Sequence, residues 1–444
     1  MSGPEIQVQW DPVAPTAPWS VPLFTDPKAC IGAASLDDVR RTTKSELGLD
    51  PDRPVVVVGH QPVLWHPGIL AKFIAGDVLA HRHGAQLVHL VIDAHRGPFG
   101  SVDWPEGSDP ESFHEAQWRC MEFDPDVPMC RQPARPPAEA PDGHAQAEVL
   151  KGLQECHDAL AAAKDQASAA DQFAFALDRL MDPWVGPRTT VTASRLMETA
   201  IGHRLLNEMK HDANQCAAAC NMAIGRDPTL GIHRLGDHGH GLELPVWIER
   251  TGSLETAVVA DLDAKGATFH PKALMVTALA RLGLGDLFIH GLGGWRYDQA
   301  MEDWIKEWLG LVPPPRALVT ATMQLPLLDP EWIRSTQAEL VQRVRRRRHD
   351  PEATSHQHGP GPTKSRSLAE IEQLPRGSSQ RRDAFQRMHG WIDRQETADD
   401  GGHQRCAARL DELAALQSRR TWAFPMHAAP ELEALREGVM AATT

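Results

Sequence analysis

The stretch from residue 55 to residue 92 constrains the fold of this chain more than any other. Residues 55–58 are four valines, and they run into the polar sequence Gly-His-Gln-Pro at 59–62. Apolar residues then recur at helical spacing over residues 69–83, and a second apolar run covers 87–92. β-branched runs favour buried strands, and 3.6-residue periodicity favours a helix. The pattern therefore predicts strand, polar loop, helix and strand, the unit from which open α/β sheets are built.

Composition limits the class of protein. A chain of 444 residues predicts two or three structural units. The net charge of −14 argues against a nucleic-acid partner, and no apolar run is long enough to span a membrane. Seven scattered cysteines and a start without a basic, apolar leader indicate reduced thiols in the cytoplasm. We therefore expect a cytoplasmic protein with a small-molecule substrate.

Changes in pattern along the chain suggest four segments. Residues 1–144 hold the first half of the core and a proline-rich excursion, and residues 145–230 have the helical periodicity of an insertion. Strand-like runs return in residues 231–330, including a pair of strands joined by a turn. Residues 331–444 are charged and helical, typical of a helical hairpin or short coiled coil through which a homodimer would form.

The first candidate site follows the valine strand. A glycine there lets the backbone approach a ligand, and the amides at the start of the next helix bind anions. A histidine donates to a phosphate or acts as an acid or base, and a lysine one turn into the helix reaches the same anion. The alternative is that the histidines only tie the loop to backbone carbonyls. The residues concerned are Gly59, His60, Gln61, His66, Gly68 and Lys72.

The second candidate is the pair Asp93 and His95, which leaves the second strand at its carboxyl end. In open α/β sheets ligands bind at that end. A carboxylate there binds a metal, orients a histidine or accepts a substrate amine. The alternative reading is an Asx-turn that ends the strand.

Two further candidates lie at expected starts of helices. His270 and Lys272 flank Pro271, a residue that suits the first turn of a helix, where negative ligand groups bind. The other follows a short strand ending at His290, where a glycine loop leads into a helix expected to start near residue 298. It matches neither the P-loop nor the dinucleotide fingerprint. Its proposed ligand-binding residues are Gly291, Gly293, Gly294 and Arg296.

Four of these segments together resemble the BshC family, which is assigned the cysteine-adding step of bacillithiol synthesis. Residues 59–72 resemble its TGQQ…GGP…K segment, and residues 93–95 resemble the end of its EDHD strand. Residues 269–274 resemble its RP…L segment, and residues 288–294 resemble its Y-x-GGPGE segment. The order and rough spacing agree over about residues 54–325. Here Pro62 replaces the second glutamine, and only Asp93 and His95 remain of the acidic group.

The resemblance implies a Rossmann-like core, related to nucleotidyl transferases, with a helical insertion and a C-terminal coiled coil. It also implies a ligase or nucleotidyl-transfer enzyme that uses ATP or ADP and a small amine- or thiol-bearing metabolite. In that reading His60 and His270 contact phosphates, and Lys72 and Lys272 balance the phosphate charge. Asp93 and His95 bind or activate the amine-bearing substrate. Two alternatives stay open: a metal-dependent hydrolase with His60, His66, Asp93 and His95 as ligands, and a non-catalytic relative that binds a small molecule.

Overall fold

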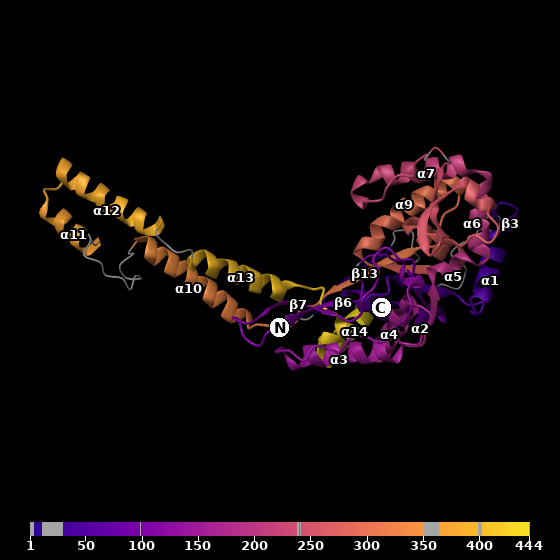
Figure 1. Cartoon of the computed structure of the whole chain (residues 1–444), viewed down its shortest axis with the longest axis horizontal. Helices are drawn as coiled ribbons and strands as arrows, with labels where there is room; N and C mark the ends of the chain where they lie inside the picture. The colour runs from indigo at the N-terminus through magenta and orange to yellow at the C-terminus, as the bar shows by residue number, and fades with distance from the viewer. Residues whose placement is uncertain are drawn as a thin grey trace. The chain divides into compact units, whose positions relative to one another are not determined.

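The chain forms two compact units (Figure 1). The computed structural model describes residues 4–10, 30–97, 99–237, 239, 241–349, 364–397 and 402–443. The first unit takes in the described parts of Met1–Pro105, Glu115–Leu325 and Arg420–Thr444. The second consists of Glu106–His114 and the described parts of Pro326–Arg419.

A six-stranded sheet lies at the centre of the first unit, in the order β1-β13-β12-β4-β5-β8. Strand β1 is an antiparallel edge, and the other five are parallel to one another. Numbered along the chain, the parallel strands run 3-2-1-4-5 across the sheet, so the order reverses between β4 and β12. The strands are β1 (Glu5–Trp10), β4 (Val55–His60), β5 (Gln86–Val91), β8 (Thr189–Thr192), β12 (Leu287–His290) and β13 (Arg316–Thr322).

Helices cover both faces of this sheet, which explains the valine run. Successive side chains of a strand point to opposite faces. Val55 and Val57 accordingly belong to one apolar cluster, whereas Val56 and Val58 belong to another. All four are buried, as expected for a parallel strand between two helical layers. The prediction of an α/β protein with a parallel sheet is confirmed.

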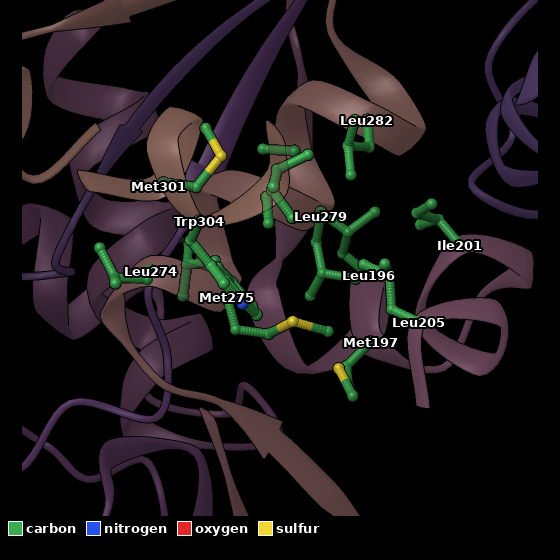
Figure 2. Packing of buried hydrophobic residues seen from close by; sticks show 14 of the residues in the cluster. Leu196, Met197, Ile201, Leu205, Leu274, Met275, Leu279, Leu282, Met301 and Trp304 are labelled. Carbon is green, nitrogen blue, oxygen red and sulfur yellow. The ribbon is translucent and has the colours of Figure 1, made fainter. Parts of the chain in front are cut away.

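The larger helical layer packs on the face of Val55 and Val57. Figure 2 shows side chains of this layer, from Leu196 in α5 to Trp304 in α9, gathered into one apolar cluster. Two of its cysteines, Cys216 and Cys220, lie one turn apart on α7 and are buried there. The helices are α1 (Leu36–Glu46), α5 (Ala193–Met197), α6 (Ala200–His211), α7 (Ala213–Arg226), α8 (Ala273–Leu279), the π-helical turn η4 (Ala280–Leu284) and α9 (Leu292–Leu309).

A small antiparallel sheet packs into the same layer, in the order β10-β9-β11. Its strands are β9 (Glu243–Arg250), β10 (Ser253–Val258) and β11 (Phe269–Pro271). The predicted pair of strands around the turn at 251–252 corresponds to β9 and β10. Pro271 ends a strand instead of starting a helix, because its segment pairs with β9 and α8 begins only at Ala273.

The opposite face carries α2 (Pro67–His83), α4 (Ala169–Met181) and α14 (Ala429–Thr443). Helix α2 ends at Gly84, whose φ of 61° is the left-handed conformation that favours glycine. Helix α14, near the end of the chain, packs against both α2 and β1. Residues far apart in sequence thus complete one layer.

We expect Leu435→Ala in α14 to lower the free energy of unfolding by about 2–5 kcal/mol, because this leucine is fully buried in the layer over β4. Met440→Ala on the same helix is the matched control, since Met440 is 41% exposed. It should change stability by less than about 0.5 kcal/mol. Urea denaturation of the two variants measures this, and equally small effects would contradict the placement of α14 in the core.

The remaining elements of the first unit are short or peripheral. Strand β8 lies inside the stretch 145–230 that the sequence predicts to be helical, and β6 and β7 form a ribbon within the proline-rich excursion. They are β2 (Cys30–Ile31), β3 (Ala34–Ser35), β6 (Ser101–Glu106), β7 (His114–Arg119), η1 (Met129–Arg131), α3 (Ala147–Ala162), η2 (Pro228–Leu230), η3 (Val259–Asp263) and η6 (Phe424–Met426).

The second unit is helical, in line with the prediction of helices toward the C-terminus. It contains α10 (Pro330–His349), α11 (Lys364–Gln373), α12 (Ser379–Thr397) and α13 (Gly402–Ser418). Helices α10 and α13 lie side by side (Figure 1), and α11 and α12 share a small apolar cluster around Ile371 and Met388. None of the helices in the described ranges has the length and apolarity needed to cross a membrane.

Candidate functional site

A cavity of about 590 Å³ opens where β4 and β12 end, the point at which the strand order reverses. It lies wholly within the first unit. Most of the residues proposed from sequence line it, although they come from four separate segments of the chain. These are Gly59, His60, Gln61, His66, Gly68, Lys72, His95, Lys272, Gly291, Gly293 and Gly294.

Two glycines bring the backbone close at the start of α2. A Cβ at Gly68 would lie 2.5 Å from the carbonyl oxygen of Ala321 in β13, a distance that no side chain tolerates. A Cβ at Gly59 would lie 3.1 Å from the ring of Phe288. Glycine is therefore required at position 68 by the close approach of α2 to β13, whereas a side chain at position 59 would crowd Phe288.

Lys72 is the most unusual residue in this wall. Its side chain extends from the second turn of α2 and is only 3% exposed, and Nζ donates to the carbonyl oxygen of Gly59 at 2.9 Å. None of the described carboxylates pairs with it. Burial lowers the pKa of Lys72 from 10.5 to about 7. A buried amine without a counter-charge is costly, and such groups cluster at functional sites.

The two histidines beside Lys72 are held neutral. His66 caps α2, its Nδ1 accepting from the amide of Gly68 at 3.1 Å. Burial, with the charges of Arg420 and Lys72, lowers the pKa of His66 to about 4. His60 Nδ1 lies 3.1 Å from the carbonyl oxygen of Gln61, so Nδ1 carries the proton. Burial first, and Lys72 second, lower the pKa of His60 well below 6.5.

The predicted glycine loop is the first turn of α9. Gly291 is the N-cap and the helix starts at Leu292, earlier than the expected start near residue 298. The first intrahelical bond to the N-cap carbonyl comes from Trp295 N, at 3.0 Å. The preceding amides of the first turn have no partner within the helix. Gly293 and Gly294 line the cavity together with Lys72, and nothing lies within 4 Å of a Cβ at Gly293.

The charge of the lining is one-sided. Four cationic side chains line the cavity, and no Asp or Glu is among the described residues that do so. Lys272 forms an ion pair with Glu243 at 2.5 Å and lies over the ring of Trp247. For Arg420 and Lys72, no carboxylate in the described ranges forms an ion pair. The cationic residues are Lys72, Arg96, Lys272 and Arg420.

Three predicted site residues lie outside the cavity. Asp93 Oδ1 accepts from the amide of Ser194 at 3.0 Å, and Ser194 Oγ hydrogen-bonds His270 Nδ1 at 2.7 Å. His270 Nε2 lies 3.2 Å from Glu249, so this buried network ties the end of β5 to α5 and β11. Burial raises the pKa of Asp93. Arg296 points to the surface, where it pairs with Asp227 at 2.6 Å.

The cavity also contains residues outside the proposed ligand-binding set, two of which, His290 and Tyr297, lie within the candidate segment 290–298. His290, at the end of β12, lines it together with Tyr297, Thr320 and Arg420. Behind His290 lie Asp298 and Arg281, both fully buried. Asp298 lies at the end of the candidate segment 290–298, whereas no local motif marks Arg281, whose ion pair with Asp298 joins η4 to α9.

The proposed metal ligands do not form a metal site. Asp93 lies outside the cavity that His60, His66 and His95 line. No group of three or more His, Cys, Asp or Glu side chains in the described ranges is arranged to hold a metal ion.

Comparison with known proteins adds no assignment to this geometry. The chain matches no protein-family model and, in a search of curated proteins, no protein.

Proposed function

We propose that this protein is a nucleotide-dependent enzyme, a BshC-like ligase or nucleotidyl transferase, that binds the phosphates of ATP or ADP in the cavity between β4 and β12. Its second substrate would be a small amine- or thiol-bearing metabolite. The observation that carries the proposal is the cavity wall itself, which combines a buried, unpaired lysine with the start of α9 and contains no carboxylate in the described ranges.

The topology supports this position for a nucleotide. The parallel strands have the order 3-2-1-4-5 of the Rossmann fold, and nucleotides bind that fold where the order reverses. We therefore propose a Rossmann-like core, as the resemblance to the BshC family implies. The coiled coil of that family would correspond to the helices of the second unit, and a homodimer through them remains a prediction.

Electrostatics supports an anionic ligand. The protein carries a net charge of −14, yet the lining of this cavity is cationic. The amides of a helix start and a nearby ammonium group form the usual cradle for a phosphate. A bound phosphate would give the Lys72 amine the counter-charge that the described part of the protein does not provide.

The roles of individual residues follow from their places. Lys72 and the amides of Gly293 and Gly294 would hold phosphate oxygens, and Nε2 of neutral His60 would accept a hydrogen bond from a donor group of the ligand. Lys272 and Arg96, which both lie over the ring of Trp247, would contact the far end of the ligand. Asp93 and His270 are placed to hold β5 and β11 in position. We assign them no direct contact with phosphates.

Isothermal titration with ATP and ADP in the presence of Mg²⁺ tests the proposal. The wild type should bind, and Gly293→Val should weaken binding at least about tenfold, a loss of about 1.4 kcal/mol. The added side chain meets no protein atom within 4 Å of its Cβ, so it should fill the cavity without disturbing the fold.

Lys306→Val is the matched control, because Lys306 is exposed on α9 and does not line the cavity. It should bind nucleotide as the wild type does. No binding of either nucleotide by the wild type would overturn the proposal, as would equal affinity in the Gly293→Val variant.

A further inference from the structure

From the geometry around His290 we infer that this histidine is the general base of the site, that Asp298 positions it, and that it takes the proton from the nucleophile of the second substrate. The inference rests on the proposed function, since it places an acid–base group beside the proposed phosphate cradle. Both residues lie in the candidate segment 290–298, but nothing in the sequence indicates that they pair.

The hydrogen bonds around His290 define its tautomer. Its Nε2 lies 2.9 Å from Asp298 Oδ2, and Asp298 also forms an ion pair with Arg281 Nη1 at 2.6 Å. Because Arg281 helps keep the pKa of Asp298 far below its usual range, against the opposing effect of burial, Asp298 is an anion that only accepts. The proton of neutral His290 is therefore on Nε2, and Nδ1 has a free lone pair.

The free nitrogen lies at the cavity. Nδ1 would be 2.5 Å from a Cβ at Gly294, so glycine at this position of α9 makes room for it. His290 and Gly294 both line the cavity, and no hydrogen bond to Nδ1 comes from the described residues. The ring stacks on Phe288 with 4.2 Å between centroids, which fixes its plane. A base held in this way needs little reorganisation to react.

The surroundings of His290 lower its pKa and so keep the base neutral at rest. Burial lowers the pKa of His290, Asp298 raises it, and Arg281 and Lys72 lower it further. As the nucleophile attacks phosphorus, His290 Nδ1 would accept its O–H, N–H or S–H proton. The bond from phosphorus to the departing pyrophosphate or ADP breaks with its electron pair. The imidazolium that forms keeps its Nε2 proton, and the Asp298 carboxylate balances its charge.

His89 provides a matched internal comparison for this pair. Its Nδ1 lies 3.0 Å from the Asp178 carboxylate, and its Nε2 is buried without a hydrogen-bond partner among the described residues. It does not line the cavity. His89 and Asp178 therefore form a pair that only stabilises the fold. The pair of His290 and Asp298, in contrast, lies next to the space where the ligand would bind.

Modification by diethyl pyrocarbonate, mapped by mass spectrometry, separates the two roles. The reagent acylates unprotonated, accessible imidazole nitrogens. In the full-length protein, His290 should react at pH 7 together with the exposed His114, while His89 should not. ATP should protect His290 and leave His114 reactive. In Asp298→Asn the midpoint of the pH profile of His290 should move to lower pH, because the carboxylate that favours the imidazolium is gone.

The outcomes distinguish the inference from the function on which it rests. If ATP binds by calorimetry but His290 is as inert as His89, or reacts equally with ATP bound, the inference is wrong. If ATP does not bind, the proposed function fails whatever the reactivity of His290. If Asp298→Asn does not fold, the wild-type protection experiment still decides between a base and a structural histidine.

Discussion

Lys72→Met is expected to reduce the affinity for ATP by about 100-fold or more while making the folded protein more stable at neutral pH. Removing one partner of a buried charge pair commonly costs 2–5 kcal/mol of binding. The phosphate would lose the only buried amine that lines the cavity among the described residues. Calorimetry with ATP measures the first effect, and urea denaturation measures the second.

The gain in stability follows from the lowered pKa. Lowering the pKa of Lys72 from 10.5 to about 7 corresponds to a cost of about 5 kcal/mol for keeping it charged in the folded state. The unfolded chain holds this proton up to pH 10.5, and the folded protein releases it above pH 7. Between these values the unfolded state binds more protons, so the stability of the wild type rises with pH.

Lys72→Met lacks this rise, because methionine has no proton to lose. Its advantage over the wild type should be largest below pH 7 and should shrink as the pH approaches 10.5. Lys151→Met, at an exposed position of α3, is the control and should leave affinity and stability unchanged. A Lys72→Met protein that binds ATP normally would refute the role of this amine.

Arg281→Met is expected to lower the free energy of unfolding by about 3–5 kcal/mol. The guanidinium is buried, and it pairs with Asp298 and Glu302, both at 2.6 Å, and donates to the carbonyl of Pro314 at 2.8 Å. Its removal leaves two carboxylates without this partner. The second change Asp298→Asn should restore part of the loss, because it removes the most buried of these charges.

Arg41→Met gives the comparison at the surface. Arg41 pairs with Asp52 at 2.5 Å, but both side chains are exposed, and solvent screening leaves such pairs with little effect on stability. Thermal and urea unfolding of the three variants would measure the difference. If Arg281→Met were no less stable than Arg41→Met, the buried network behind His290 would not exist as described.

The core of the fold could be predicted where the local pattern is strong. The valines at 55–58 and the periodicity of α2 identified β4, α2 and β5, since both signals depend only on neighbours in sequence. Strand β8 could not be predicted, because it has only four residues, Thr189–Thr192, and three of them are polar. The place of α14 was not foreseen either, because no local pattern says which distant element a helix covers.

The candidate site, too, contains residues that local patterns predict and residues that only tertiary packing brings together. Gly59, His60 and Lys72 line the cavity. Their place could be predicted, because the strand and the helix that carry them have strong local patterns. His270 and Asp93 have the right residue types, but Ser194 ties both into a buried network that only the tertiary structure reveals. His290 and Asp298 are eight residues apart and meet only because α9 folds back over the end of β12.

A crystal structure with ATP bound tests the central claim most directly. The account predicts phosphate oxygens within hydrogen-bond distance of Lys72 Nζ and of the amides of Gly293 and Gly294, at the point where the strand order reverses. ATP bound elsewhere on the protein, or an empty cavity at saturating ATP, would contradict it.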